Sequence, residues 1–232
     1  MKTKVYSQTR NIRNTLANLI LSRRVKKKDF TIVSVDCWGS SIYQEMGLGY
    51  NTPFVGLFFY APCFITLLSN LEQFLQSDLE FIETSKYPSA NEDRRGKAGN
   101  YPIGLLGGEV EIHFLHYESE EDARAKWNAR RARMNMDNLF VEFSDRNLCT
   151  NEHLLAFDNL PFRNKVVFTA QKHPDVRSAV WLSEFAAKPH IDNIYNKTYY
   201  YKRHFDMADW LNGGRGQVRP LYRLVSKLLE VR

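Results

Sequence analysis

Hydrophobic and polar positions follow one another in blocks that predict alternating strands and helices along the chain. Short apolar runs predict strands at residues 30–35, 54–60, 79–83, 138–143 and 165–169. Amphipathic segments predict helices at about 38–46, 62–76, 119–133 and 151–159. Strands that alternate with helices are typical of α/β domains. We therefore expect a mixed, largely parallel sheet flanked by helices in Rossmann-like layers.

Three segments depart from this alternation. Residues 101–117 predict an inserted β-hairpin, because Gly107-Gly108 forms a two-residue turn that permits positive φ. Residues 84–100 are polar and charged, which predicts a long loop. Residues 171–204 are aromatic-rich without a clear period, and two final helices are predicted at 205–211 and 221–229.

One uncharged stretch, Met46 to Leu71, is long enough to imitate a membrane span. Pro53 and Pro62 interrupt it, and the apolar positions after Pro62 fall on one helical face. We therefore expect this stretch to belong to the core of the folded domain.

Charge is distributed unevenly. The chain has 32 Lys and Arg against 26 Asp and Glu, a net charge of +6. Residues 1–28 hold nine of the basic residues and no acidic one, so the rest carries 23 − 26 = −3. A basic pI that resides in an arm argues against a nucleic-acid-binding domain. We divide the chain into a basic arm, 1–28, and an α/β domain, 29–232, with two lobes at 29–100 and 101–232 as an alternative.

The arm also has helical periodicity. Ile12, Leu16, Leu19 and Ile20 form one apolar stripe, and basic residues surround or follow it. Such a helix can lie on an anionic bilayer. The alternatives are an ordinary helix packed on the body and an arm that binds RNA or a protein partner. We expect a cytoplasmic protein, peripheral on the inner face of the cell membrane if the arm binds lipid.

The composition, 44% hydrophobic and 25% charged, is that of a globular protein. Three scattered cysteines suggest reduced thiols. Nucleotide-binding loops and zinc motifs are absent, so we expect no metal and no cofactor. His113 and His116 do not make a ligand pair, because an odd offset places them on opposite faces of a strand.

Ligands of parallel α/β sheets bind beyond the carboxyl ends of the strands, so candidate residues are sought there. The first strand runs into a helix through the segment Asp36-Cys37-Trp38-Gly39-Ser40. Backbone N–H groups at such a helix start can bind a phosphate. Cys37 and Ser40 are candidate nucleophiles. The alternative is a buried cysteine and a helix-capping serine.

The strand at 138–143 leads into Ser144-Asp145-Arg146. Asp145 can act as a base and Arg146 can bind a phosphate, or the two form a local ion pair. On the preceding helix, Lys126, Arg130 and Arg133 share one face that can receive a diphosphate. The alternative is a solvated face on which Asp122 pairs with Lys126.

Several motifs together resemble a bacterial family of unknown function whose members lie in exopolysaccharide, capsule and O-antigen loci. The resemblance covers about residues 29–214 and rests on these segments: Val35-Asp36-Cys37-Trp38-Gly39, Tyr50-Asn51-Thr52-Pro53-Phe54, Tyr101-Pro102-Ile103-Gly104, His116-Tyr117, Lys126-Trp127-x-x-Arg130-x-x-Arg133, Ser144-Asp145-Arg146, Phe157-Asp158-x-Leu160-Pro161, Val167-Phe168-Thr169 and Trp210-Leu211-Asn212. The family pattern has Asn at Asp36 and Gly at Ser40. The resemblance implies a role in surface-polysaccharide assembly.

We therefore expect a transferase, glycosyltransferase-like, that acts on a glycan, a nucleotide sugar or a lipid-linked precursor. The expected catalytic residues are Asp145 and Cys37. The expected substrate-binding residues are Asp36, Trp38, Gly39, Ser40, Arg130, Arg133, Arg146 and Thr169. The alternatives are a polysaccharide O-acyltransferase or esterase, with His116 or His173 as base, and a non-catalytic assembly or regulatory protein.

Overall fold

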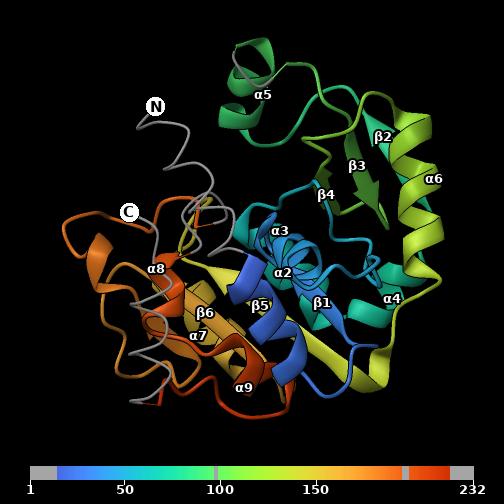
Figure 1. The fold of residues 1–232 in the computed structure, drawn as a ribbon. Helices are drawn as coiled ribbons and strands as arrows, with labels where there is room; N and C mark the ends of the chain where they lie inside the picture. The colour runs from blue at the N-terminus through green and yellow to red at the C-terminus, as the bar shows by residue number, and fades with distance from the viewer. Residues whose placement is uncertain (1–14, 97–98, 195–198, 220–232) are drawn as a thin grey trace, which may run out of the picture.

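Two sheets form the framework of the protein (Figure 1). The computed structural model describes residues 15–96, 99–194 and 199–219. A parallel sheet has the strand order β1 (Thr31–Ser34), β5 (Leu139–Ser144), β6 (Lys165–Thr169) and β7 (Ala179–Trp181). An antiparallel sheet has the order β2 (Leu79–Ile82), β3 (Ile103–Leu106) and β4 (Val110–His113). The predicted α/β fold with a largely parallel sheet and a hairpin is confirmed.

The parallel sheet is covered on both faces, which explains its continuous apolar strands. Alternate residues of β1 enter different clusters: Ile32 packs with Trp38 of α2 (Trp38–Met46) and Trp210 of α9 (Met207–Leu211). Val33 lies in the other cluster, with residues of α3 (Ala61–Ser69), α7 (Asn151–Asn159) and the antiparallel sheet. Each cluster takes residues from both sides of position 100, so the core shows no division there.

Local sequence signals fix several boundaries. Helix α6 (Glu120–Arg131) begins after Ser119, whose hydroxyl accepts a hydrogen bond from the amide of Asp122 at 3.1 Å, as an N-cap should. The hairpin turn has positive φ at Gly107 and Gly108, 57° and 73°. The predicted hairpin is therefore confirmed, with β2 added as a third strand.

Two element predictions are wrong. Residues 54–60 form no strand, because their hydrogen bonds go to different sheets: the Phe58 amide donates to the carbonyl of His113 and the Phe59 amide to that of Val35, both at 2.9 Å. The helix predicted at 62–76 is broken at Asn70 into α3 and α4 (Leu71–Gln76). An apolar run in the sequence predicts that a segment is buried, but it does not predict which strands the backbone of that segment hydrogen-bonds to.

Further differences lie in the predicted loops. Residues 84–100 contain helix α5 (Pro88–Arg95), whose proline occupies the first turn. The irregular region 171–204 contains β7 and the whole of the short helix α8 (Tyr199–Lys202). At the N-terminal end, residues 15–24 are helical. The helix predicted at 221–229 lies outside the described residues. Among the described helices, none has the length and apolar character to cross a bilayer.

Candidate functional site

The carboxyl ends of β1 and β5 bring Asp36 and Arg146 together. The two strands are parallel neighbours, so residues 110 positions apart meet at one edge of the sheet. Arg146 Nη1 lies 3.0 Å from Asp36 Oδ2, and Asp36 Oδ1 accepts a hydrogen bond from the Trp38 amide at 2.9 Å. Asp36 is thereby fixed as an ion-paired carboxylate at the start of helix α2.

Helix α2 begins unusually close to β1. A Cβ added at Gly39 would lie 2.8 Å from Cβ of Ser34 and 2.9 Å from Cγ2 of Ile32. The Gly39 amide donates to the Ser34 hydroxyl at 3.1 Å, and that hydroxyl donates to Glu142 Oε2 at 2.6 Å. Gly39 therefore serves close packing, and its lack of a side chain sets the position of the helix start.

A pocket of about 320 Å³ opens beside this helix start. It combines residues of α2, of the loops around residues 50–56 and 116–117, and of α6. Its lining is Cys37, Ser40, Gln44, Tyr50, Val55, Gly56, His116, Tyr117, Lys126 and Arg130. We call it the carboxyl-edge pocket, because β1 leads directly into the Cys37 wall.

Two cations reach the pocket from successive turns of α6. The Arg130 guanidinium donates to the Tyr117 hydroxyl at 2.7 Å and lies over the Tyr50 ring, 5.2 Å from its centroid. Lys126 Nζ lies 2.8 Å from Asp122 Oδ2 and 5.4 Å from the centroid of the Tyr117 ring. The Asp122 pair predicted for a solvated face is therefore present, and the same lysine still lines the pocket. Cations held over aromatic rings suit an anionic ligand.

The family follows from the sequence as a whole. The chain belongs to the family described as Domain of unknown function (DUF1919), whose model matches residues 8–212. It is also 33% identical over 214 residues to an uncharacterized protein of Haemophilus influenzae (strain ATCC 51907 / DSM 11121 / KW20 / Rd), a match that covers 90% of this chain and 97% of the relative. The expected family of unknown function is confirmed. The DUF1919 match also includes the helix at residues 15–24.

Six of the eight residues expected to bind substrate lie outside the pocket lining of this DUF1919 domain. Asp36 and Arg146 form the ion pair described above, and the other four are Trp38, Gly39, Arg133 and Thr169. Trp38 is fully buried, with its ring edge-on to those of Phe168 and Tyr201. Gly39 packs on β1, and Thr169 is fully buried, with its hydroxyl donating to the Gln171 carbonyl. Arg133 follows the end of α6 and is exposed. Trp38 and Thr169 are thus core residues, because the helix and strand on which they lie turn them away from the solvent.

Asp145 connects two loops. Its carboxylate oxygens accept hydrogen bonds from the amides of Ala170 and Ile191, at 2.6 and 2.9 Å. Burial raises the pKa of Asp145 above its ordinary value, although the two amide hydrogen bonds oppose this shift. The position suits a structural tie between loops, and a catalytic role for Asp145 stays a prediction.

Cys37 and Ser40 lie in the pocket wall, where their side chains donate hydrogen bonds to backbone carbonyls. Burial, with a smaller effect of the Asp36 carboxylate, raises the pKa of the Cys37 thiol to about 11. The Ser40 hydroxyl donates to the Cys37 carbonyl at 2.7 Å. His116 lines the same pocket and is exposed. At neutral pH the Cys37 thiol is therefore protonated, which disfavours it as a nucleophile.

Glu142 is a buried acid that the sequence analysis did not single out. It occupies β5 opposite Ser34, and burial raises its pKa well above the ordinary value, with a further contribution from Asp36. Its Oε1 has no hydrogen-bond partner among the described residues. The signal in the sequence was a lone Glu within an apolar strand. Burial thus favours the protonated form of Glu142, close to the Asp36–Arg146 ion pair, and carboxyl groups in unlike environments occur in acid–base sites.

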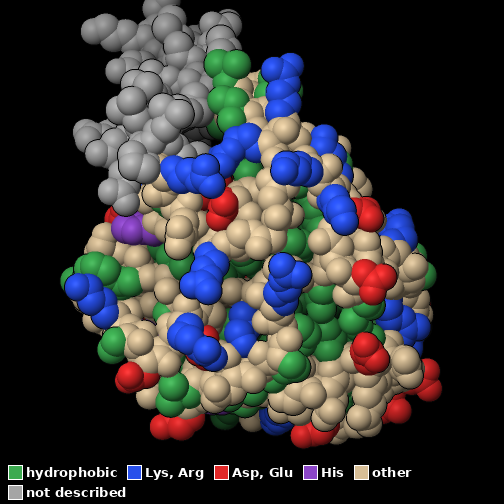
Figure 2. All heavy atoms as spheres, turned by 90° about the horizontal axis from the view of Figure 1, so that it is seen from below, with side chains coloured by type: hydrophobic (Ala, Val, Ile, Leu, Met, Phe, Trp, Pro, Cys, Tyr) green, Lys and Arg blue, Asp and Glu red, His purple; other side chains and the backbone are tan. Residues whose placement is uncertain are grey.

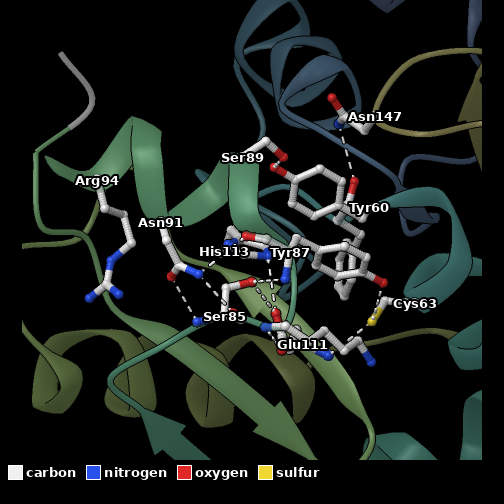
Figure 3. Close-up of polar contacts among 12 residues, drawn as sticks. Tyr60, Cys63, Ser85, Tyr87, Ser89, Asn91, Arg94, Glu111, His113 and Asn147 are labelled. Carbon is white, nitrogen blue, oxygen red and sulfur yellow. Dashed lines mark hydrogen bonds and ion pairs between the residues drawn. The ribbon is translucent and has the colours of Figure 1, made fainter. Parts of the chain in front are cut away.

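A second polar cluster lies between β4 and α5 (Figure 3). Glu111 accepts hydrogen bonds from the Ser85 hydroxyl at 2.5 Å and the Lys86 amide at 2.8 Å. His113 is fully buried and stacks on Phe58, with 4.7 Å between ring centroids. Burial, together with the charges of Arg94 and Lys86, lowers the pKa of His113 to about 3. The predicted separation of His113 from His116 is confirmed, since the first is buried and the second exposed.

Another hollow lies at the opposite, amino-terminal edge of the parallel sheet. Its volume is about 1020 Å³, and its wall includes Lys26, Lys27, Asn138, Arg163 and Asn164. None of the expected site residues lines it. Across the described part of the chain, no group of three His, Cys, Asp or Glu side chains is arranged to hold a metal ion.

Proposed function

We propose that this protein is a transferase that binds a phosphate-bearing glycan precursor in the carboxyl-edge pocket, and that it transfers a glycosyl group in bacterial surface-polysaccharide biosynthesis. The observation that carries the proposal is the convergence of Lys126, Arg130 and the start of helix α2 on one pocket beyond the parallel strands. A diphosphate carries the charge that the Lys126 and Arg130 side chains complement. The motifs that resemble a polysaccharide-locus family supply the glycan context.

In this proposal the cations of the pocket bind the phosphates and a carboxylate handles the reacting hydroxyl. Arg130 and Lys126 bind phosphate oxygens, and the Tyr50 and Tyr117 rings hold the cations in place. Asp36 lies next to Cys37 of the pocket wall in the chain, and we assign it the role of hydroxyl ligand or base. Arg146 keeps Asp36 in position.

Acyl transfer from Cys37 is the weaker alternative. A covalent mechanism requires a thiolate or an activated hydroxyl. The Cys37 pKa of about 11 and the Ser40 hydrogen bond to a backbone carbonyl both oppose this. His116 lines the same pocket and is the candidate base for such a mechanism.

The test is a thermal-shift screen of the full chain with nucleoside diphosphates, nucleotide sugars and acyl-coenzyme A species. Ligand at about 100 times its dissociation constant adds roughly 2.7 kcal/mol, a rise of about 5–10 °C for a domain of this size. We expect a nucleotide-sugar or nucleoside-diphosphate species to give this rise. A rise with coenzyme A alone would support acyl transfer, and none with any species would favour a non-catalytic role.

Variants locate the site. Lys126→Ala combined with Arg130→Ala should abolish the rise, whereas Arg133→Ala, a matched cation outside the pocket lining, should retain it. Equal loss in both variants would place the ligand elsewhere. Asp36→Asn and Asp145→Asn, assayed for transfer once a ligand is known, separate the two candidate carboxylates.

A further inference from the structure

The helix over residues 15–24 presents an apolar stripe to the solvent. Leu16, Leu19 and Ile20 are 48%, 49% and 38% exposed. Their spacing places them on one helical face. The other large exposed apolar side chains of the described chain, Met136, Leu148 and Leu155, lie singly or in separate elements. Within the described part of the chain, the stripe is therefore an apolar patch that faces the solvent.

Cations directly follow the stripe. Arg23, Lys26, Lys27 and Lys28 are all exposed, and residues 1–28 contain no acidic residue. In the space-filling view, hydrophobic side chains project from the molecule beside Lys and Arg side chains (Figure 2). Apolar side chains next to exposed cations complement a surface that offers both hydrocarbon and negative charge.

The end of the helix is clamped to the body. Asn212 accepts a hydrogen bond from the Lys26 amide at 2.9 Å and donates one to the Arg24 carbonyl at 2.8 Å. The Arg24 guanidinium lies 2.5 Å from Asp206 Oδ2, and Val25 is buried. The clamp holds Lys26–Lys28 in place and fixes the direction in which the stripe points.

We propose that this surface, residues 16–28, docks the protein on an anionic lipid bilayer. Leu16, Leu19 and Ile20 enter the headgroup boundary, while Arg23 and Lys26–Lys28 bind lipid phosphates. A symmetric second copy would place these cations against each other, which is repulsive. Single-stranded nucleic acid binds through stacking on aromatic rings, and this stripe is aliphatic.

The experiment is flotation of the full chain with vesicles of phosphatidylcholine containing about one-third phosphatidylglycerol, against vesicles of phosphatidylcholine alone. We expect binding to the anionic vesicles, weakened by salt because exposed charges are screened. Leu16→Ser/Leu19→Ser/Ile20→Ser and Lys26→Gln/Lys27→Gln/Lys28→Gln should each weaken binding about tenfold or more, since each basic residue contributes about 1 kcal/mol.

Matched controls carry the same changes elsewhere. Leu148→Ser/Leu155→Ser and Arg95→Gln/Arg133→Gln/Lys172→Gln alter exposed residues outside this surface and should bind as the unchanged protein does. Absence of binding to anionic vesicles, or equal loss in the controls, would overturn the proposal. The proposal would also be overturned if the protein bound no vesicles but self-associated or was retained on polyuridylate, and if the variants within residues 16–28 abolished that behaviour. The cation variant and the salt dependence still decide the matter should the stripe variant fail to fold.

Discussion

Asp36 and Arg146 form an ion pair of 3.0 Å between the loops that follow two adjacent parallel strands. Strand β1 ends at Ser34, two residues before Asp36, and strand β5 ends at Ser144, two residues before Arg146. The pair therefore joins the ends of β1 and β5 at the edge where α2 begins, and it holds the wall of the carboxyl-edge pocket in place.

We expect Arg146→Ala to destabilise the protein by about 1–3 kcal/mol, because the Asp36 side chain is only 10% exposed and would lose its ion partner. Urea unfolding measures the change. Lys188→Ala is the control: in its pair with Asp192 the two side chains are 48% and 29% exposed, so the loss should stay below about 1 kcal/mol. Equal losses would show that the Asp36 pair contributes nothing special.

The buried carboxyl group of Glu142 should make the stability of the folded protein depend on pH. Its pKa is raised in the folded protein, so the folded state retains a proton that the unfolded state loses above about pH 4.3. This contribution is present at low pH and declines as pH rises toward the folded pKa. Glu142→Gln removes this pH-dependent contribution. The melting temperature of the variant should therefore rise relative to that of the unchanged protein between pH 5 and pH 8, by no more than the titration of one Glu side chain can produce. Glu72→Gln, on an exposed residue, should show no such gain; a parallel pH profile for Glu142→Gln would refute the assignment.

Cys37 should react slowly with iodoacetamide at neutral pH. A thiol with a pKa of about 11 exposes little thiolate, so peptide-resolved mass spectrometry should find alkylation about a hundredfold slower than for a free cysteine. Cys37→Ala should correspondingly preserve transfer activity. Rapid alkylation of Cys37 would instead support covalent acyl transfer.

Gly39→Ala should destabilise the protein by about 1–3 kcal/mol, because the new methyl group meets Ser34 and Ile32 at under 3.0 Å and the helix start must shift. Gly49→Ala tests the substitution alone, since a Cβ there meets no atom within 4 Å. Denaturant unfolding compares the two. A Gly39→Ala protein as stable as Gly49→Ala would mean that α2 can move away from β1 without cost.

Parts of the fold and site were predictable because their signals are local. The hairpin follows from Gly107-Gly108, the start of α6 from Ser119, and the pairing of Asp122 with Lys126 from helical spacing. The carboxyl-edge rule also led to the segment around Cys37 and Ser40, two residues that line the pocket. These signals need only neighbours within a few residues, and the chain carries them wherever it folds.

Other features depend on packing between distant segments. The run 54–60 is apolar enough for a strand, yet its hydrogen bonds divide between Val35 and His113, which a sequence cannot show. Three further features also depend on residues far apart in the chain. They are the shared pocket of Arg130 and Cys37, the burial of Trp38, and the two hydrogen bonds that Asp145 accepts from backbone amides.

The sequence by itself determined the α/β class, the basic arm with its apolar stripe, and the edge of the sheet at which to look for a site. Only the tertiary structure decided which side chains share the pocket, that Glu142 is a buried acid, and that Leu16, Leu19 and Ile20 face the solvent. The physical reason is that periodicity and turn chemistry act over one or two turns of chain. Burial, ion pairing and pKa depend instead on groups that come together only when the chain has folded.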